Sequence, residues 1–157
     1  MDDSITFRYA IREDLPGIVA LLADDEKGST REHFSAPLPA AYYSAFDAME
    51  SQSTSALPNR YLLACDGGRT VGCLQLTLIA GLSRSGQLRA QIEGVRVASN
   101  ARNQGIGERL IQQAIAVSKE YGAGLVQFTT DKTRPEAHRF YERLGFVASH
   151  EGMKMML

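Results

Sequence analysis

The chain is poor in cysteine and histidine, and this excludes several classes of protein. Two cysteines, Cys65 and Cys73, are too few for a disulfide scaffold, and they lack metal-ligand spacing with the three histidines. We therefore expect no metal site. Both cysteines are expected to behave as small buried apolar residues on strands.

Long apolar runs are also absent. No stretch approaches the roughly 18 consecutive apolar residues of a membrane-spanning helix, and the N-terminus is polar and acidic rather than an apolar leader. We expect a soluble, cytoplasmic protein without a membrane partner. Because repeats, low-complexity tracts and linkers are missing, residues 1–157 are expected to form one domain.

The formal net charge is only −1, but it is unevenly divided. Residues 1–60 carry ten acids and five bases, whereas residues 61–157 carry eight acids and twelve bases. This division is either chance on solvated faces or a sign that the second half binds an anion. No nucleic-acid partner is expected.

The most informative stretch runs from Gln91 to Ser118. It begins as an apolar strand, passes through a polar turn that contains Gly105 and Gly107, and continues as an amphipathic helix. The first N–H groups of a helix have no intrahelical partners and lie at the positive end of its dipole, so they can bind a phosphate. The two glycines would let such a phosphate approach the main chain.

Two familiar phosphate-binding motifs are missing from this turn. It contains neither the G-x-G-x-x-G of dinucleotide-binding folds nor the G-x-x-x-x-G-K-[ST] of the Walker loop. It reads Arg102-Asn103-Gln104-Gly105-Ile106-Gly107. Taken alone, these residues also fit an ordinary strand-to-helix turn.

The rest of the chain predicts alternating strands and helices. An Asp-Gly-Gly-Arg junction at 66–69 indicates a hairpin, Gly94 indicates a bulge, and the segment 24–39 is long enough to be a functional loop. Asp14 is a plausible cap for the first helix, and Gly145 for the last. Strands are expected at 4–11, 61–65, 71–79, 91–97 and 125–130, helices from 16, 40 and 135, and a final hairpin from 146–149 and 154–157.

Two motifs give the chain a resemblance to a known family. Arg102 to Gly107 matches the pattern R/Q-x-x-G-x-G/A, and Ala137 to Phe146 is similar to A-x-x-F/L-Y-E-x-L-G-F, about 30 residues further on. Both are typical of the GNAT superfamily of acyl-CoA-dependent N-acetyltransferases. The resemblance implies a mixed α/β fold, with a mostly antiparallel central sheet that contains a splayed parallel pair and is flanked by helices.

The resemblance also implies a reaction. The acetyl group of acetyl-CoA would pass directly to a primary amine of a small molecule. Two alternatives stay open: a protein acetyltransferase acting on a lysine or an N-terminus, and an acyl-CoA-binding sensor without catalysis. The small-molecule amine acceptor is the expected binding partner, and a homodimer is a further possibility. The acidic first half and the loop 24–39 favour a cationic acceptor.

The coenzyme-binding residues implied by the resemblance lie on the bulged strand, in the Gly-containing loop and in the second motif. Many family members have Asn where this chain has Arg134, so that contact is not transferred to Arg134. The implied set is Val95, Arg96, Val97, Arg102, Asn103, Gln104, Gly105, Ile106, Gly107, Glu108 and Tyr141.

Two residues are candidates for catalysis. Glu93 precedes the bulge and could take the proton of the amine, directly or through water, if burial makes its carboxylate a stronger base. It could instead form an ion pair with Arg89 or another arginine. Tyr141 matches the tyrosine that protonates the leaving thiolate in the family, but a packed aromatic without a chemical role is the alternative.

Overall fold

The computed structural model describes residues 4–157. Its internal contacts divide the chain into two units, one extending to Gln127 and the other Phe128–Leu157. The one-domain expectation stays a prediction, and each unit is described by itself.

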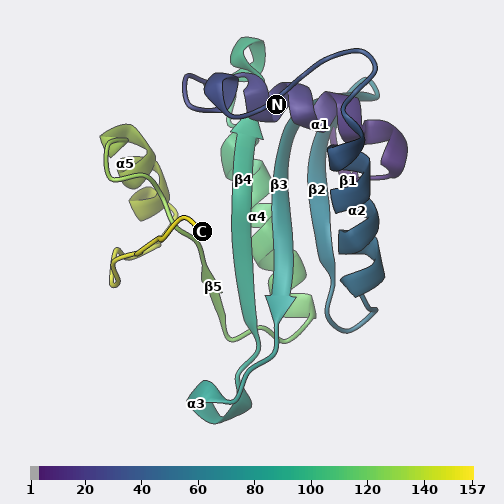
Figure 1. The fold of residues 1–157 in the computed structure, drawn as a ribbon. Coiled ribbons are helices and arrows are strands. Elements are labelled where there is room, and N and C mark those ends of the chain that lie inside the picture. Colours follow the sequence, from purple (N-terminus) through teal and green to yellow (C-terminus); the bar gives the residue numbers. More distant parts are fainter. Residues whose placement is uncertain (1–3) are drawn as a thin grey trace. The chain divides into compact units, whose positions relative to one another are not determined.

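The first unit is built on a five-stranded sheet whose strand order follows the sequence (Figure 1). Neighbouring strands are antiparallel from the first to the fourth, and the fourth and fifth are parallel. The mixed α/β class and the mostly antiparallel sheet are therefore confirmed. The strands are β1 (Ile5–Tyr9), β2 (Asn59–Asp66), β3 (Arg69–Ile79), β4 (Arg89–Val97) and β5 (Leu125–Gln127).

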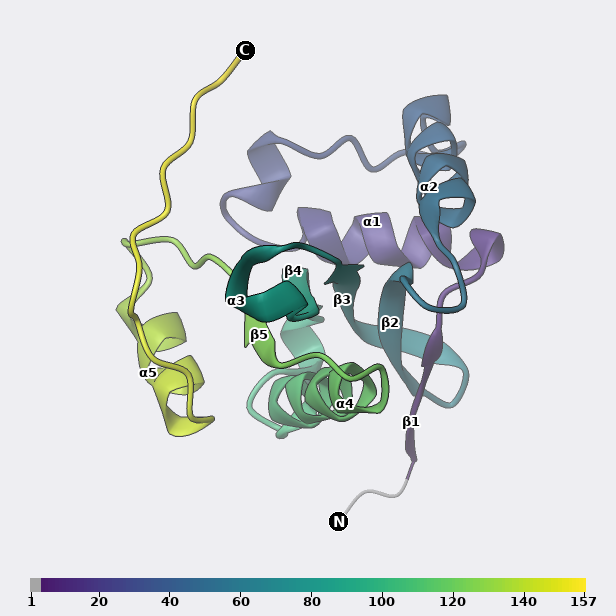
Figure 2. The ribbon, with the colours of Figure 1, turned by 90° about the horizontal axis from the view of Figure 1, so that it is seen from below.

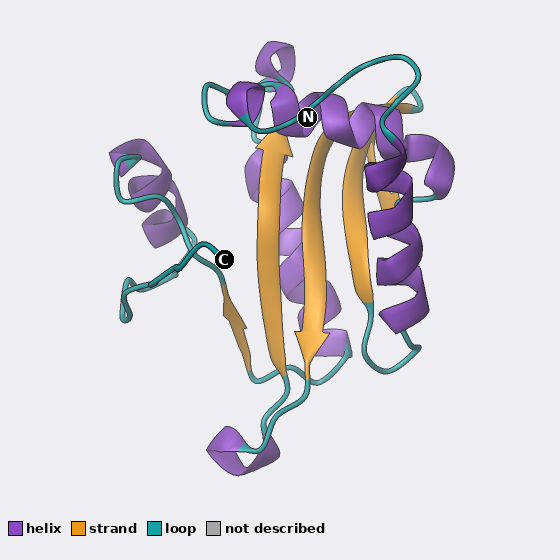
Figure 3. Cartoon of the chain, in the orientation of Figure 1, coloured by secondary structure: helices purple, strands orange, loops and turns teal. Residues whose placement is uncertain are grey.

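Helices cover both faces of this sheet. Figure 2 shows α4 on one side and α1 and α2 on the other, and Figure 3 shows the same layers by type of structure. None of the helices among residues 4–157 combines the length and the apolar character needed to cross a lipid bilayer. The helices of this unit are α1 (Leu15–Ala23), α2 (Ala40–Gln52), the short α3 (Ser83–Gly86) and α4 (Ile106–Glu120).

The alternation of side chains along the strands builds two apolar layers. On β3, Leu74, Leu76 and Leu78 are buried on the same face as Gly72, which lies against Ile106 of α4. The opposite face packs on α1 and α2. Its core cluster includes Leu63, Cys65, Cys73, Ile18, Val19 and Phe46. Both cysteines are free and buried, as predicted.

The hairpin between β2 and β3 has the predicted turn. Asp66 pairs with Arg69, and Gly67 and Gly68 have φ angles of 54° and 82°. A two-residue turn of this kind needs positive φ at both positions, which glycine adopts without strain.

Asp14 has a different role from the one expected. The first helix begins where predicted, but the Asp14 side chain makes no capping bond to it. Its carboxylate instead accepts a bond from the Ile11 backbone N–H at 2.8 Å and pairs with Arg8 at 2.6 Å. The hydrogen bond from Arg8 lowers the pKa of Asp14.

The second unit contains α5 (Pro135–Arg143) and no strand among its described residues. The predicted final hairpin is therefore wrong, and the fifth strand ends at Gln127 instead of 130. After α5 the backbone closes the helix: Phe146 N–H bonds to the Tyr141 oxygen, and Gly145 has φ of 92°, as its predicted capping role requires. An isolated two-stranded hairpin is only marginally stable, and apolar residues at both proposed strands stay exposed: Val147, Met155, Met156 and Leu157.

Candidate active site

The bulge predicted at Gly94 is present in β4. Cys73 pairs with Arg96 and Gln75 with Glu93, so two residues of β4 stand opposite the single residue Leu74 of β3. Gly94 has φ of 60°, a conformation that a side chain would strain. The bulge interrupts the ladder with β3 and bends β4 at this point.

The other edge of β4 is also largely unpaired. The parallel ladder with β5 includes only the pairs from Arg89–Leu125 to Gln91–Gln127, although β4 continues to Val97. Backbone N–H and C=O groups that leave a ladder need other partners. An extended ligand with amide groups could supply them, in the manner of an added strand.

The segment after β4 leads into the N-terminus of α4. Gly105 precedes the helix in the left-handed conformation, with φ of 75°, and a Cβ built there would meet no atom within 4 Å. The first intrahelical bond runs from the Arg109 N–H to the Gly105 oxygen, so the N–H groups of Ile106, Gly107 and Glu108 have no partner within the helix. Gly107 lies in this first turn, and its φ is not in the positive range, unlike that of Gly105. The turn offers main-chain donors and the positive end of a 15-residue helix to an anion.

Arg102 does not direct its side chain to this anion site. Its Nε donates to the Val97 oxygen at 3.1 Å, and its Nη2 donates to the Asp24 oxygen at 2.8 Å. The Asp24 carboxylate in turn accepts a bond from the Ser99 N–H at 2.9 Å. The arginine of the motif therefore fastens the loop to the end of α1.

Three other side chains of the predicted set are exposed and lie within or beside the loop. Asn103 has φ of 61°, and Gln104 donates to the Asn100 oxygen at 3.3 Å. The Glu108 carboxylate accepts a bond from Gln112 at 3.1 Å. A carboxylate in this turn would repel a phosphate, so only the main chain of Glu108 suits the predicted role.

Arg96, which follows the bulge, has an ion pair and a main-chain hydrogen bond. The Arg96 guanidinium lies 3.0 Å from the Asp25 carboxylate, and both side chains are mostly buried. A second nitrogen of Arg96 donates to the Val95 oxygen at 2.8 Å. The oxygens of Val95 and Val97 both accept arginine bonds, so this stretch has less acceptor capacity for a ligand.

Glu93 is placed differently from the expectation. Its side chain is exposed, so the burial that would strengthen it as a base is missing. The alternative is also not met, because Glu93 forms no ion pair within residues 4–157 and Arg96 pairs with Asp25 instead. Among the described residues, Glu93 is therefore a carboxylate without an ion-pair partner, immediately before the bulge.

Tyr141 belongs to the second unit and lies on α5. Its ring packs at 4.2 Å from the Phe128 ring, at 5.0 Å from Phe140 and at 6.0 Å from Phe146, measured between centroids. Arg134 is the residue that precedes the helix, and its N–H bonds to the Asp131 oxygen. The aromatic packing orients the tyrosine ring and is compatible with either predicted role.

Sequence reasoning missed Tyr61. Its hydroxyl lies within 3.5 Å of the position of a Cβ on Gly94, next to the bulge. Burial raises the pKa of Tyr61, and the nearby Cys73, Glu32 and Glu93 add to the shift. The phenol therefore stays protonated at neutral pH. The sequence around Tyr61 predicts only an ordinary strand residue. The bulge that Tyr61 faces belongs to another strand, so its proximity could not be predicted.

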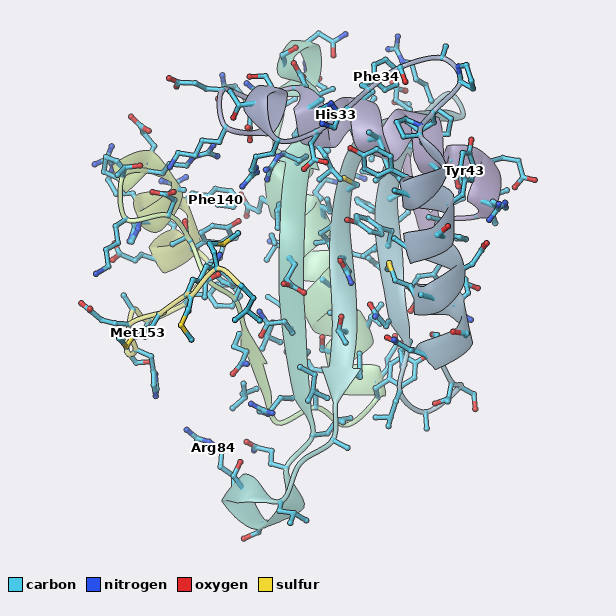
Figure 4. All side chains as sticks on the ribbon, in the orientation of Figure 1. His33, Phe34, Tyr43, Arg84, Phe140 and Met153 are labelled. Carbon is cyan, nitrogen blue, oxygen red and sulfur yellow. The ribbon has the colours of Figure 1, made fainter. Side chains whose placement is uncertain are left out.

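The loop 24–39 is anchored close to these residues. The Tyr42 hydroxyl donates to the Glu32 carboxylate at 2.9 Å and accepts a bond from the His33 N–H at 2.9 Å. Figure 4 labels His33 and Phe34 on this loop and Tyr43 on α2.

Residues 23–146 match the model of the acetyltransferase (GNAT) family. The chain belongs to this family. The predicted recognition is therefore confirmed, and the sheet with its short parallel pair is the fold of the GNAT acetyltransferases.

The chain is also similar to three known proteins. A solved structure described as a transcriptional regulator from Bacillus halodurans C-125 is 48% identical, with a TM-score of 0.91, over 98% of this chain and 99% of that one. An aminoalkylphosphonate N-acetyltransferase of Salmonella typhimurium is 34% identical over 94 residues, which are 59% of this chain and 60% of the relative. An acetyltransferase of Trypanosoma brucei shares the fold at 24% identity and a TM-score of 0.77, over 98% of this chain and 99% of that one.

Proposed function

We propose that this chain transfers the acetyl group of acetyl-CoA directly to a primary amine of a small molecule. The observation that carries the proposal is one continuous main-chain path. It runs from the bulge at Gly94, along the edge of β4 beyond its short ladder with β5, to the N–H groups at the start of α4 that have no partner within the helix.

The chemistry of acetyl-CoA fits this path. Its pyrophosphate is an anion that suits the turn from Gly105 to Glu108, and its pantetheine amides can bond to the edge of β4. Open space at Gly105 lets a phosphate approach the backbone. The thioester would then lie at the bulge, next to Glu93 and Tyr61.

The proposed reaction has one bond formed and one broken. The amine nitrogen bonds to the acetyl carbon while the carbon–sulfur bond breaks. The amine proton passes to a base, for which Glu93 is the proposed group, acting through water because it is exposed. The departing thiolate takes a proton from an acid, for which the family motif indicates Tyr141.

The curated relative supports an amine acceptor, since its name describes N-acetylation of an aminoalkylphosphonate. Its substrate is not transferred to this chain, because the match covers 60% of its length. The second candidate function is an acyl-CoA-binding sensor without turnover. The description of the 48% identical structure as a transcriptional regulator favours it.

One assay separates the two functions. Purified protein is incubated with acetyl-CoA and single amines: amino acids, polyamines, amino sugars, aminoalkylphosphonates and short peptides. CoA release is measured together with the mass of the product. An enzyme releases CoA in step with an acetylated amine. A sensor binds acetyl-CoA in a calorimetric titration but releases no CoA with any amine, and acetylation of peptides alone would favour a protein acetyltransferase.

A further inference from the structure

One face of the sheet changes from apolar to polar along β2, β3 and β4. Near α1 this face carries the buried residues Leu63, Cys65 and Cys73. Further along the same strands, the next two positions on this face of each strand are polar, before the row of Ile79 and Arg89, and Gln127 of β5 continues the row of Gln91. We call these residues the polar strip: Asn59, Tyr61, Gln75, Thr77, Gln91, Glu93 and Gln127.

The strand register places the strip in two rows. Tyr61 pairs with Gln75, which pairs with Glu93. In the next row Asn59 pairs with Thr77, Thr77 with Gln91, and Gln91 with Gln127. Side chains of paired residues stand on the same face about 5 Å apart. Four strands at about 4.8 Å spacing make the second row about 14 Å wide, enough for one or two sugar rings.

Most of the strip lies outside the apolar core of the first unit, and only Tyr61, at its margin, packs against the core cluster. The alternate residues of β3 are leucines buried on the side of α4, so that face is already closed. On the side of the strip, α1 crosses one end of the strands and α2 contacts β2, and Figure 4 shows side chains standing on the rest of that face. Apart from the exposed Glu93, the strip side chains are half-buried.

The strip keeps unused hydrogen-bonding capacity. The Gln75 and Thr77 side chains donate to the Asn59 Oδ1 at 2.8 and 3.0 Å, and the Gln127 Nε2 donates to the Gln91 Oε1 at 2.9 Å. Within residues 4–157 this leaves two amide acceptors, the Oε1 atoms of Gln75 and Gln127, and the lone pairs of the Thr77 hydroxyl, which donates its proton to Asn59. It also leaves donors on the Asn59 and Gln91 amides and on the Tyr61 hydroxyl.

We propose that the polar strip is the floor on which the acceptor binds, and that the acceptor is a hydroxylated primary amine of the amino-sugar type. This inference rests on the proposed function, since the strip begins at Glu93 beside the bulge where the thioester would lie. Neutral donors and acceptors side by side match hydroxyl groups, which both donate and accept. Glu93 is the one carboxylate of the strip and attracts the amine as a cation.

The charge of the strip disfavours two other classes of amine. A phosphonate needs cationic partners. Of the two arginines nearest the strip on β4, Arg96 is paired with Asp25, and Arg89 lies four residues from Glu93, about 13 Å along the strand, which is too far for a short aminoalkylphosphonate whose amine is held at Glu93. An aliphatic polyamine needs several acidic acceptors and would leave the amides of the strip unpaired. The chain should therefore discriminate against the substrate class named for its curated relative.

The test compares glucosamine, spermidine and 2-aminoethylphosphonate at fixed acetyl-CoA. The highest kcat/KM is expected with glucosamine. Gln91→Leu and Thr77→Val should each raise the KM for glucosamine about five- to tenfold, the loss of one hydrogen bond, with kcat little changed. Gln52→Leu, an exposed position at the end of α2, is the matched control and should behave as the parent.

A binding measurement separates failure of this inference from failure of the proposed function. Glucosamine binding is followed by saturation-transfer NMR on the parent, on Gln91→Leu and on Gln52→Leu, with calorimetry of acetyl-CoA on the same samples. Binding that is lost only in Gln91→Leu supports the strip even in the absence of turnover. No glucosamine binding to the parent, or equal binding to all three proteins, overturns the inference. Acetylation of another amine class would then leave the proposed function standing.

Discussion

The Nε of Arg96 lies 3.0 Å from the Oδ2 of Asp25, and this ion pair connects the bulged strand to the segment that follows α1. The Asp25 carboxylate also accepts a bond from the Gly28 N–H. One acid therefore orders the start of the loop 24–39 and neutralises an arginine next to the coenzyme path.

Replacing Asp25 by Ala should destabilise the fold by about 2 kcal/mol, because it leaves a mostly buried guanidinium without its counter-charge. Urea unfolding of the parent, Asp25→Ala and the exposed control Glu26→Ala gives the comparison. Equal midpoints for all three proteins would show that the ion pair contributes nothing.

Gly107→Val should weaken acetyl-CoA binding at least tenfold and lower stability only modestly. The added side chain would crowd the first turn of α4, where the pyrophosphate is proposed to bind, while valine is no poorer a helix former than glycine. Calorimetry and a thermal melt on the same sample decide it. Ala116→Val, an exposed position of the same helix, adds a valine away from the proposed anion site and is the control. An unchanged dissociation constant for acetyl-CoA in Gly107→Val would show that the pyrophosphate does not bind at this turn.

Asp14 should make a pH-dependent contribution to stability. The hydrogen bond from Arg8 lowers its folded-state pKa below the ordinary value of 3.8. The contribution is therefore complete above about pH 4 and is lost as the pH falls through the lowered folded-state value. Asp14→Asn should be less stable than the parent by about 1 kcal/mol at pH 6, and the gap should close in acid. Thermal melts from pH 2.5 to 7, with Glu13→Gln as the control, test this, and a gap that stays constant with pH would contradict it.

Substitutions of Glu93 and of Tyr141 should change the kinetics in different ways: the first should change the pH dependence of the rate, and the second the rate itself. Glu93→Gln keeps the shape but not the proton acceptor, so the acidic limb of the rate–pH profile should shift, with rate recovered at high pH where free amine is abundant. The exposed Glu120→Gln should keep the parent profile. If Glu93→Gln also keeps it, another group or bulk water is the base.

Tyr141→Phe removes only a hydroxyl from the aromatic cluster with Phe128 and Phe146. The rate should fall about 10²-fold while acetyl-CoA affinity changes little. Tyr43→Phe is the matched control, since that ring stacks on Arg12. A normal rate in Tyr141→Phe would assign the tyrosine to packing alone.

Local signals predicted much of this molecule. The Asp-Gly-Gly turn, the bulge at Gly94 and the start of α4 each depend on backbone geometry that glycine makes accessible, so short segments were enough. The prediction of a final hairpin was wrong because two short apolar segments form stable strands only where they can pair with a larger sheet.

Contacts between distant segments could not be predicted. Arg102 lies in the motif for which we predict phosphate binding, yet its side chain bonds to Asp24, 78 positions earlier. Glu93 was expected in an apolar setting because its segment is largely apolar, but its neighbour Ile92 is buried on the other face of the strand. Tyr61 and the polar strip depend on the pairing of four strands, which a single sequence does not specify.

The central claim is direct transfer from the thioester to the amine, without an acetylated enzyme. The chain is incubated with acetyl-CoA labelled with ¹³C in the acetyl group, first alone and then with the best amine of the panel, and intact-protein mass, CoA release and the ¹³C spectrum are recorded together. Direct transfer predicts an unmodified protein in the first step, since both thiols are buried and burial raises the pKa of Cys73 to about 12. In the second step it predicts one ¹³C-labelled N-acetyl product for each CoA released. A stable acetyl adduct on the protein, or CoA release without an N-acetylated amine, would contradict it.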